Sequence, residues 1–153
     1  MCGDGIDKIV GAIFPILPEH VSRLFEENRD VFVKFTKFTN FRSGSVIVFY
    51  VSREKFLIGE GEIKYFERLD PEIAWSVYGD RIFLDKKDYG RYARISPVEK
   101  VNRKKKEITI FILRNICKYE NPVKLDYAIT PSGCYLTKKM FEDIRRAGGA
   151  RRF

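Results

Sequence analysis

Three segments with the character of β-strands follow one another between residues 31 and 66. In residues 31–36, Val31 and Val33 share one face and Lys34 lies on the other. Residues 46–51 are apolar on both faces, which indicates a central strand, and residues 56–66 contain Gly59 and Gly61, which suggest a bulge or a tight corner. Such closely connected strands favour a mostly antiparallel, curled sheet or small barrel with short helices at its ends.

The flanking segments supply helices and two further strands. Pro18 suits the first turn of a helix, and Asp70-Pro71 and Asp85 have the pattern of helix starts. Pro15 is expected to end the first strand. The sequence therefore predicts an α+β fold in a single domain over residues 1–153, with frayed ends at 1–7 and 148–153. Beyond the three segments above, its elements are strands at 9–14 and 107–116, helices after Pro18, at 71–75, at 85–93 and around 140–144, and a turn at 130–133.

The net charge of +8 bears on the partner of the protein. Clustered positive charge concentrates polyanions without dictating a fold, so nucleic acid is the first candidate and an anionic membrane surface the second. Generic solubility charge is the alternative, although the excess is clustered rather than evenly spread. No run approaches the roughly 18 apolar residues of a membrane-spanning helix, and we expect no membrane partner.

The three cysteines, Cys2, Cys117 and Cys134, are odd in number and widely spaced, which fits ordinary thiols in a reducing compartment. The first residues contain acids and glycines where a signal peptide needs a basic end and an apolar stretch. We therefore expect a soluble cytoplasmic protein. The 33% of charged residues and the absence of Gln match heat-adapted proteins.

The stretch from Phe32 to Arg42 interleaves cations with aromatic residues. Single-stranded nucleic acid is commonly held by cations along its phosphates and aromatic faces under its bases. Because Phe32 and Phe35 point to opposite faces of a strand, at least one belongs to the core, which makes Phe38 or Phe41 the candidate for stacking. The candidate phosphate contacts here are Lys34, Lys37 and Arg42.

Other candidate contacts are scattered along the chain. Arg103, Lys104, Lys105 and Lys106 form a basic block that must be solvated and can contact phosphates. Trp75 and Tyr78 either line an aromatic slot or anchor a helix, and Ser52 and Arg53 leave a central strand where a polar ligand could bind. Weaker candidates are the turn at 130–133, which could hold an anion, and the C-terminal Arg145, Arg146, Arg151 and Arg152.

Signatures of catalysis and of metal binding are thin. His20 is the only imidazole, is expected on the surface of a helix, and has no Ser or Cys at a spacing typical of a triad. Paired Cys or His spacing for zinc is absent as well. The sequence therefore predicts no catalytic residue, no metal and no cofactor.

The progression from Pro18 through the segment 42–52, with its Tyr50-Val51-Ser52, to Ile58-Gly59-Glu60-Gly61 resembles the PUA-like superfamily. Within it the ASCH and EVE branches look closest, over roughly residues 8 to 120. The whole chain also resembles an uncharacterised archaeal family. The resemblance implies a pseudo-barrel that binds RNA or a modified base in a cleft beside its first helix, with Lys34, Ser52, Arg53 and Trp75 facing or flanking that cleft.

The chain departs from the ASCH pattern at its charged residues. ASCH proteins carry a Lys before the first helix and a Glu-x-Arg on the following strand, where this chain has Ile16-Leu17 and roughly Lys34-Phe35-Thr36. This difference favours binding over the hydrolysis that such residues carry out.

Three hypotheses follow from the sequence. In the first, the protein binds RNA or a modified nucleotide through Lys34, Lys37, Arg42 and the block 103–106, and Trp75 or Phe38 stacks on a base. In the second, it is an ASCH-type hydrolase of a nucleoside or RNA, in which Lys34 works with Glu60 or Glu62 as an acid–base pair. In the third, the basic surface docks an acidic protein. The oligomeric state stays open.

Overall fold

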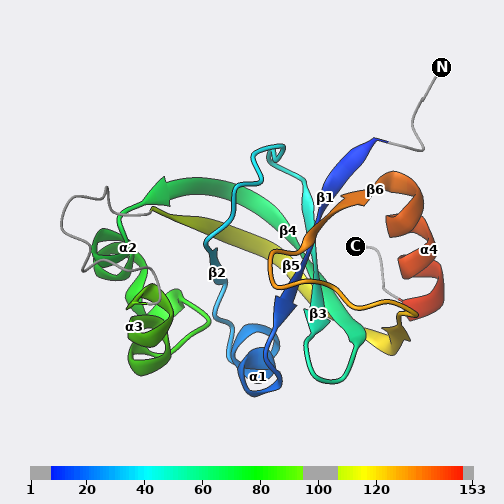
Figure 1. Ribbon diagram of the computed structural model, residues 1–153, viewed down its shortest axis with the longest axis horizontal. Coiled ribbons are helices and arrows are strands. Elements are labelled where there is room, and N and C mark those ends of the chain that lie inside the picture. The colour runs from blue at the N-terminus through cyan, green and yellow to red at the C-terminus, as the bar shows by residue number, and fades with distance from the viewer. Residues whose placement is uncertain (1–7, 95–106, 150–153) are drawn as a thin grey trace.

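The computed structural model of the protein describes residues 8–94 and 107–149. Its centre is a six-stranded sheet with the order β2-β5-β4-β3-β1-β6 (Figure 1). The neighbouring strands are antiparallel except for β1 and β3, which are parallel. This arrangement confirms the predicted mostly antiparallel α+β fold. The strands are β1 (Ile9–Ile16), β2 (Val31–Lys34), β3 (Val46–Val51), β4 (Phe56–Leu69), β5 (Ile108–Lys124) and β6 (Cys134–Thr137).

The sheet is covered on both faces along β3, and every residue of this strand is buried. Alternate side chains enter two different cores because successive residues of a strand point to opposite faces. Phe49 lies in the larger core, which includes Phe14, Phe32 and Phe111. Tyr50 lies in the smaller core, which is partly covered by α4 (Lys138–Gly148). The prediction of a central strand at residues 46–51 is confirmed.

The parallel pair β1 and β3 approaches closely at Gly11. A Cβ atom at this position would lie 1.7 Å from the carbonyl oxygen of Val46, so only glycine fits. The prediction that Pro15 ends the first strand is wrong, since β1 continues to Ile16 beside Val51. Pro15 is tolerated because β6 pairs with β1 only as far as Ile13, which leaves that side of β1 without a ladder.

The two longest strands, β4 and β5, extend well beyond the predicted segments. β4 continues to Leu69, and β5 continues from the predicted end at residue 116 to Lys124. Their pairing contains register shifts next to Gly59 and Glu60, in agreement with the bulge that the two glycines predict. These shifts let a long pair of strands bend around the core.

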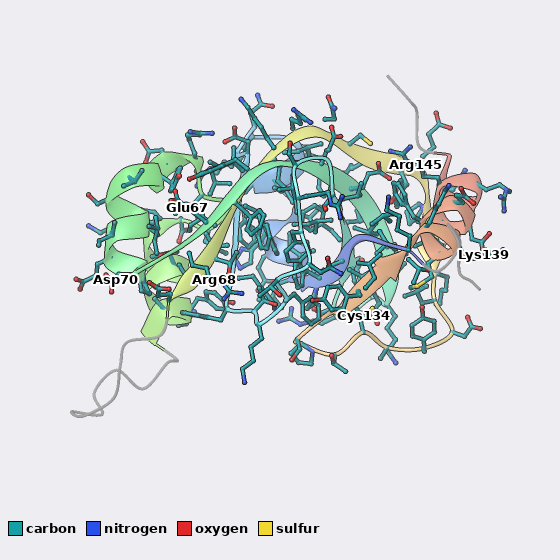
Figure 2. The ribbon with its side chains drawn as sticks, turned by 90° about the horizontal axis from the view of Figure 1, so that it is seen from above. Glu67, Arg68, Asp70, Cys134, Lys139 and Arg145 are labelled. Carbon is teal, nitrogen blue, oxygen red and sulfur yellow. The ribbon has the colours of Figure 1, made fainter. Side chains whose placement is uncertain are left out.

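The helices of residues 71–78 and 86–94 lie at one end of the sheet and α4 lies at the other, as predicted, whereas the short helix of residues 21–25 lies between these ends (Figures 1 and 2). The side chain of Asp70 caps α2 by accepting from the Glu72 N–H at 3.1 Å, and Thr137 caps α4 by accepting from the Met140 N–H at 3.2 Å. The helices are α1 (Val21–Phe25), which follows a 3₁₀ turn at Pro18–His20, then α2 (Pro71–Tyr78), α3 (Lys86–Arg94) and α4.

The C-terminal region holds the elements that the sequence analysis did not anticipate. β6 pairs with β1 from Ile13↔Cys134 to Ile9↔Thr137, where only a turn and a helix were expected. Frayed structure was expected from residue 148 on, yet Gly148 is the last residue of α4 and is buried against Tyr119. Gly149 then ends the helix in the left-handed conformation.

Candidate functional site

Lys34 is the last residue of the edge strand β2 and is half-buried. Its Nζ donates a hydrogen bond to the carbonyl oxygen of Pro131 at 2.7 Å and lies 5.8 Å from the centre of the Phe14 ring. Burial lowers the pKa of the amine from 10.5 to about 8, because removal from water disfavours its charged form. A half-buried cation thus joins β2 to the turn that precedes β6 (Figure 1).

A stack of aromatic rings lies beside this amine. Phe38 stacks on Phe14 with ring centres 5.8 Å apart and on Tyr135 of β6 with centres 4.3 Å apart and planes 19° from parallel. The Thr39 N–H donates to the Tyr135 hydroxyl at 3.3 Å. We call the place where Lys34, Phe38 and Thr39 meet Pro131 and Tyr135 the β2–β6 seam.

The seam joins the two edges of the sheet without a strand ladder among the described residues. Within the described residues, β2 forms a ladder with β5 and a single bridge between Val31 and Ile82, and β6 forms a ladder with β1. Edge strands present backbone N–H and C=O groups that can bond to another molecule. The seam therefore combines an amine, aromatic rings and backbone polar groups in one place.

Arg68 of β4, two strands away from β2 in the sheet, holds the loop of the seam. Its Nη2 donates to the carbonyl oxygens of Thr36 at 3.4 Å and Phe38 at 3.1 Å, and its Nε donates to the Thr109 hydroxyl at 3.3 Å. The Phe35 N–H donates to the Tyr92 hydroxyl of α3 at 2.9 Å. These contacts fix the path of residues 35–38, and sequence reasoning missed Arg68 and Tyr135.

Two of the predicted phosphate contacts lie on the same loop as Phe38. Lys37 and Arg42 are both exposed, and no ion pair is formed by either with the described part of the chain. The Arg42 N–H donates to the Ser45 hydroxyl at 3.0 Å, which turns the loop into β3. Lys34, Lys37, Phe38 and Arg42 thus lie within one segment of the chain, and their shared role in binding stays a prediction.

The other predicted cleft residues have different surroundings. Ser52 donates its N–H to the Ile16 carbonyl at 3.1 Å, and the exposed Arg53 pairs with Glu19 at 3.4 Å. The ring of Trp75 packs against Tyr89 with centres 5.0 Å apart, between α2 and α3. These contacts place Ser52 and Arg53 beside the first helix and Trp75 at the far end of the sheet (Figure 1).

The aromatic pair on α2 has the contacts of a helix anchor. The Tyr78 hydroxyl donates to Glu67 Oε2, and burial together with this bond raises the pKa of Tyr78 to about 12. The Tyr89 hydroxyl donates to the Pro71 carbonyl at 2.6 Å at the start of α2. These bonds tie α2 to its neighbours, as the anchor interpretation of Trp75 and Tyr78 expects.

The basic block Arg103, Lys104, Lys105 and Lys106 lies outside the described residues, as do Arg151 and Arg152. Glu107 follows the block, and two residues later Thr109 pairs with Lys34 in the β2–β5 ladder. In the sequence, the block therefore ends three residues before the register partner of Lys34.

The two carboxylates considered as catalytic partners of Lys34 bond to other groups. Glu60 is 4% exposed and accepts from the Tyr119 hydroxyl at 2.9 Å and from Arg145. Glu62 accepts from Arg114 and Asn115, each at 2.9 Å. The observed hydrogen bonds of both carboxylates are thus to groups other than the Lys34 amine.

His20 is buried, which corrects the expectation of a surface position. Arg23 donates to its Nδ1 at 2.9 Å and pairs with Asp85 and Asp88, so the imidazole belongs to a contact between α1 and α3. Burial lowers the pKa of His20, and Asp88 opposes this effect. In the described residues, no three His, Cys, Asp or Glu side chains gather as metal ligands, and no helix there could cross a bilayer.

Comparison with known proteins gives a family and a fold. The family described as a domain of unknown function, DUF365, matches residues 9–138. The uncharacterized protein MJECS03 of Methanocaldococcus jannaschii is 32% identical over 102 residues, which cover 64% of this chain and 94% of that protein. Both findings agree with the predicted resemblance to an uncharacterised archaeal family.

Solved structures confirm the resemblance to ASCH domains. The crystal structure of ASCH from Zymomonas mobilis has a TM-score of 0.72 at 19% identity and covers 90% of this chain and 94% of that chain. A single-residue variant of the same protein has a TM-score of 0.73 at 19% identity and covers 92% and 98%. The protein thus has the PUA-like fold of ASCH domains.

Proposed function

Because the chain belongs to the DUF365 family, whose description names no activity, we propose a function from the site itself: the protein binds single-stranded RNA and holds one base in the β2–β6 seam. The observation that carries the proposal is the meeting of the Lys34 amine, the Pro131 carbonyl and the stacked rings of Phe38 and Tyr135. Each of these groups suits a different part of a nucleotide.

A flat base needs an apolar face and polar groups at its edge. We assign the first to the face of the partly exposed Tyr135 ring that does not stack on Phe38, since base–aromatic stacking contributes roughly 1–3 kcal/mol. The Lys34 amine offers the second, because an ammonium has three donors and the Pro131 carbonyl takes one of them. A modified base with an altered hydrogen-bonding edge would be distinguished at the same place.

The phosphates need cations beside the base. Lys37 and Arg42 are exposed on the loop that carries Phe38. Lys106 is three residues from Thr109, and three residues of chain span at most about 11 Å, so this end of the basic block can reach the seam. The proposed phosphate contacts are therefore Lys37, Arg42 and the block 103–106.

An ASCH-type hydrolase is the second candidate, and one observation favours it. An amine with a pKa of about 8 is partly neutral near neutral pH and can accept a proton. However, Glu60 and Glu62 bond to Arg145 and Arg114 instead of Lys34. Hydrolysis would therefore need another carboxylate as the partner of Lys34, whereas binding needs no such partner.

The test is the affinity for fluorescently labelled oligouridylate, measured by anisotropy over a series of salt concentrations. The variant Lys37→Ala/Arg42→Ala should reduce the slope of log affinity against log salt by about 1.4, since each phosphate contact to a single strand contributes about 0.7. The matched control is Lys86→Ala/Lys87→Ala, which removes two exposed cations from α3.

The proposal fails if the protein has no affinity at low salt, or if both variants change the slope equally. Mass spectrometry of the oligonucleotide after incubation distinguishes the second candidate, because a binding protein returns it intact. Cleavage or loss of a base substituent that depends on Lys34 would instead favour the hydrolase.

A further inference from the structure

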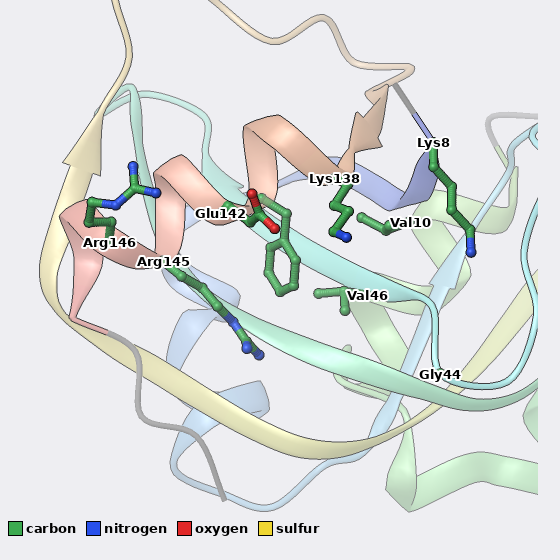
Figure 3. Close-up of a pocket in the computed structure, with 9 residues that line it drawn as sticks. Lys8, Val10, Gly44, Val46, Lys138, Glu142, Arg145 and Arg146 are labelled. Atoms are coloured by element: carbon green, nitrogen blue, oxygen red, sulfur yellow. The ribbon is translucent and has the colours of Figure 1, made fainter. Parts of the chain in front are cut away.

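A groove of about 760 Å³ lies between α4 and the starts of β1 and β3 (Figure 3). The apolar side chains of its lining are those of Val10, Val46 and Phe141. Lys8, Lys138, Arg145 and Arg146 line it together with a single carboxylate, that of Glu142. The lining of the groove thus combines apolar side chains with more cations than anions.

The two arginines of the groove already have anionic partners. Arg145 pairs with the buried Glu60 and lies 4.4 Å from the centre of the Phe141 ring, and Arg146 pairs with Asp143 at 3.0 Å. These contacts fix the guanidinium of Arg145 at the groove and offset much of its charge.

The two lysines of the groove have no such partners among the described residues. Both side chains are exposed. The Lys138 N–H donates to the Lys8 carbonyl at 2.8 Å, so the two side chains leave adjoining points of the backbone. They are the cations of the groove that remain available to an anion.

The groove and the seam share the segments that border them. Tyr135 of the seam is three residues before Lys138, a separation of about 10 Å along an extended chain. The loop with Phe38, Lys37 and Arg42 ends at Gly44, which lines the groove. The seam's Phe14 and Phe38 belong to the larger core, and the groove's Val46 and Phe141 belong to the smaller one, so the two sites lie on opposite faces of the sheet. An RNA chain that leaves the seam would reach the groove by passing around the edge strand β6.

We propose that this α4 groove holds the phosphates that flank the base in the seam, so that the ligand is a strand of several nucleotides and not a free nucleoside. The inference rests on the proposed function. From Lys138 to Arg145, α4 rises about 10 Å, which is the length of about three stacked nucleotides at 3.4 Å each. The apolar lining of the groove suits the flat face of a base beside the amines of Lys8 and Lys138.

The experiment compares oligouridylates of increasing length, each over a salt series. The variant Lys8→Ala/Lys138→Ala should lower the salt slope for the longest oligouridylate by about 1.4, and its affinity should stop rising at a shorter length than that of the wild type. Lys86→Ala/Lys87→Ala is again the control, because Lys86 is the first residue of α3 as Lys138 is of α4.

The outcomes separate the groove from the seam. If the groove variant keeps the wild-type slope and length dependence, the groove proposal is wrong, and the Lys37→Ala/Arg42→Ala variant then shows whether the proposed function survives. If an oligoglutamate peptide of equal charge displaces oligouridylate as well as unlabelled oligouridylate does, the groove binds an acidic protein instead. Equal slope changes in groove and seam variants, which add in the combined variant, are the expected result.

Discussion

Replacement of Lys34 by methionine should make the protein more stable at neutral pH while it weakens RNA binding. Burial lowers the pKa of this amine from 10.5 to about 8. The difference corresponds to a cost of about 3 kcal/mol for keeping the amine charged in the folded state, at about 1.4 kcal/mol for each pH unit. Methionine fills a similar space without this cost.

The contacts that Lys34→Met removes reduce this gain in stability. The hydrogen bond to Pro131 contributes about 1 kcal/mol, and the contact with the Phe14 ring contributes about 0.5 to 1 kcal/mol. At pH 7 the free energy of unfolding of Lys34→Met should therefore exceed that of the wild type by about 1 kcal/mol, the difference between these contributions.

The difference in stability between Lys34→Met and the wild type should depend on pH. Below pH 8 the amine is charged in both states, so the wild type bears the full cost. Between about pH 8 and 10.5 the unfolded state binds more protons than the folded state, so the stability of the wild type rises with pH. The advantage of Lys34→Met should decline through this window and reverse at its upper end.

The assay is urea unfolding of both proteins at several pH values, and only the difference between them is used. Lys64→Met, the same substitution at an exposed lysine of β4, is the matched control. A difference for Lys34→Met that is constant with pH, or a variant less stable than the wild type at pH 7, would refute the reasoning.

Two further predictions concern the fold around the site. Tyr119→Phe should lower the free energy of unfolding by about 1.5 to 3 kcal/mol in urea unfolding, because it removes a hydrogen bond to the buried Glu60 carboxylate. Tyr135→Phe should lower it by less than about 1 kcal/mol, because the Tyr135 hydroxyl accepts from an exposed backbone N–H. Equal losses of stability in the two variants would contradict this account. Gly11→Ala should prevent folding as judged by circular dichroism, because its Cβ would meet the Val46 carbonyl at 1.7 Å, whereas Gly90→Ala on α3 has open space and should fold normally.

The parts of the fold that depend on local signals were predictable from the sequence. β3 is apolar at every position, which indicates a central strand. Asp70-Pro71 indicates the start of α2, because Asp70 caps the helix with its side chain and Pro71 needs no N–H partner there. Each of these signals lies within a few residues of the structure that it specifies. They sufficed for the α+β class and for the resemblance to ASCH domains.

The parts that depend on distant pairing were not predictable in the same way. β6 has four residues and is a strand because β1 lies beside it, and the second half of β5 carries polar residues that are ordered by β4. Arg68 and Tyr135 act on the loop of Phe38 from strands 30 and 97 positions away in the sequence. No spacing pattern connects such residues, although β-branched and aromatic residues at 134–137 are a weak strand signal.

The candidate site was predicted in part. The interleaved cations and aromatics from Phe32 to Arg42 drew attention to Lys34, Lys37, Phe38 and Arg42, which lie on one segment. The turn at 130–133 was noted as well, but its contact with Lys34 spans 97 residues and emerges only from the curl of the sheet. The roles of all these residues in binding stay predictions.

Ultraviolet crosslinking of the protein to bound oligouridylate, followed by mass spectrometry of the crosslinked peptides, tests the central claim most directly. The account predicts crosslinks at Phe38 or Tyr135. These crosslinks should disappear in Lys37→Ala/Arg42→Ala at a salt concentration that releases oligouridylate from this variant. Crosslinks confined to Trp75 and its neighbours on α2, with none at the seam, would contradict it.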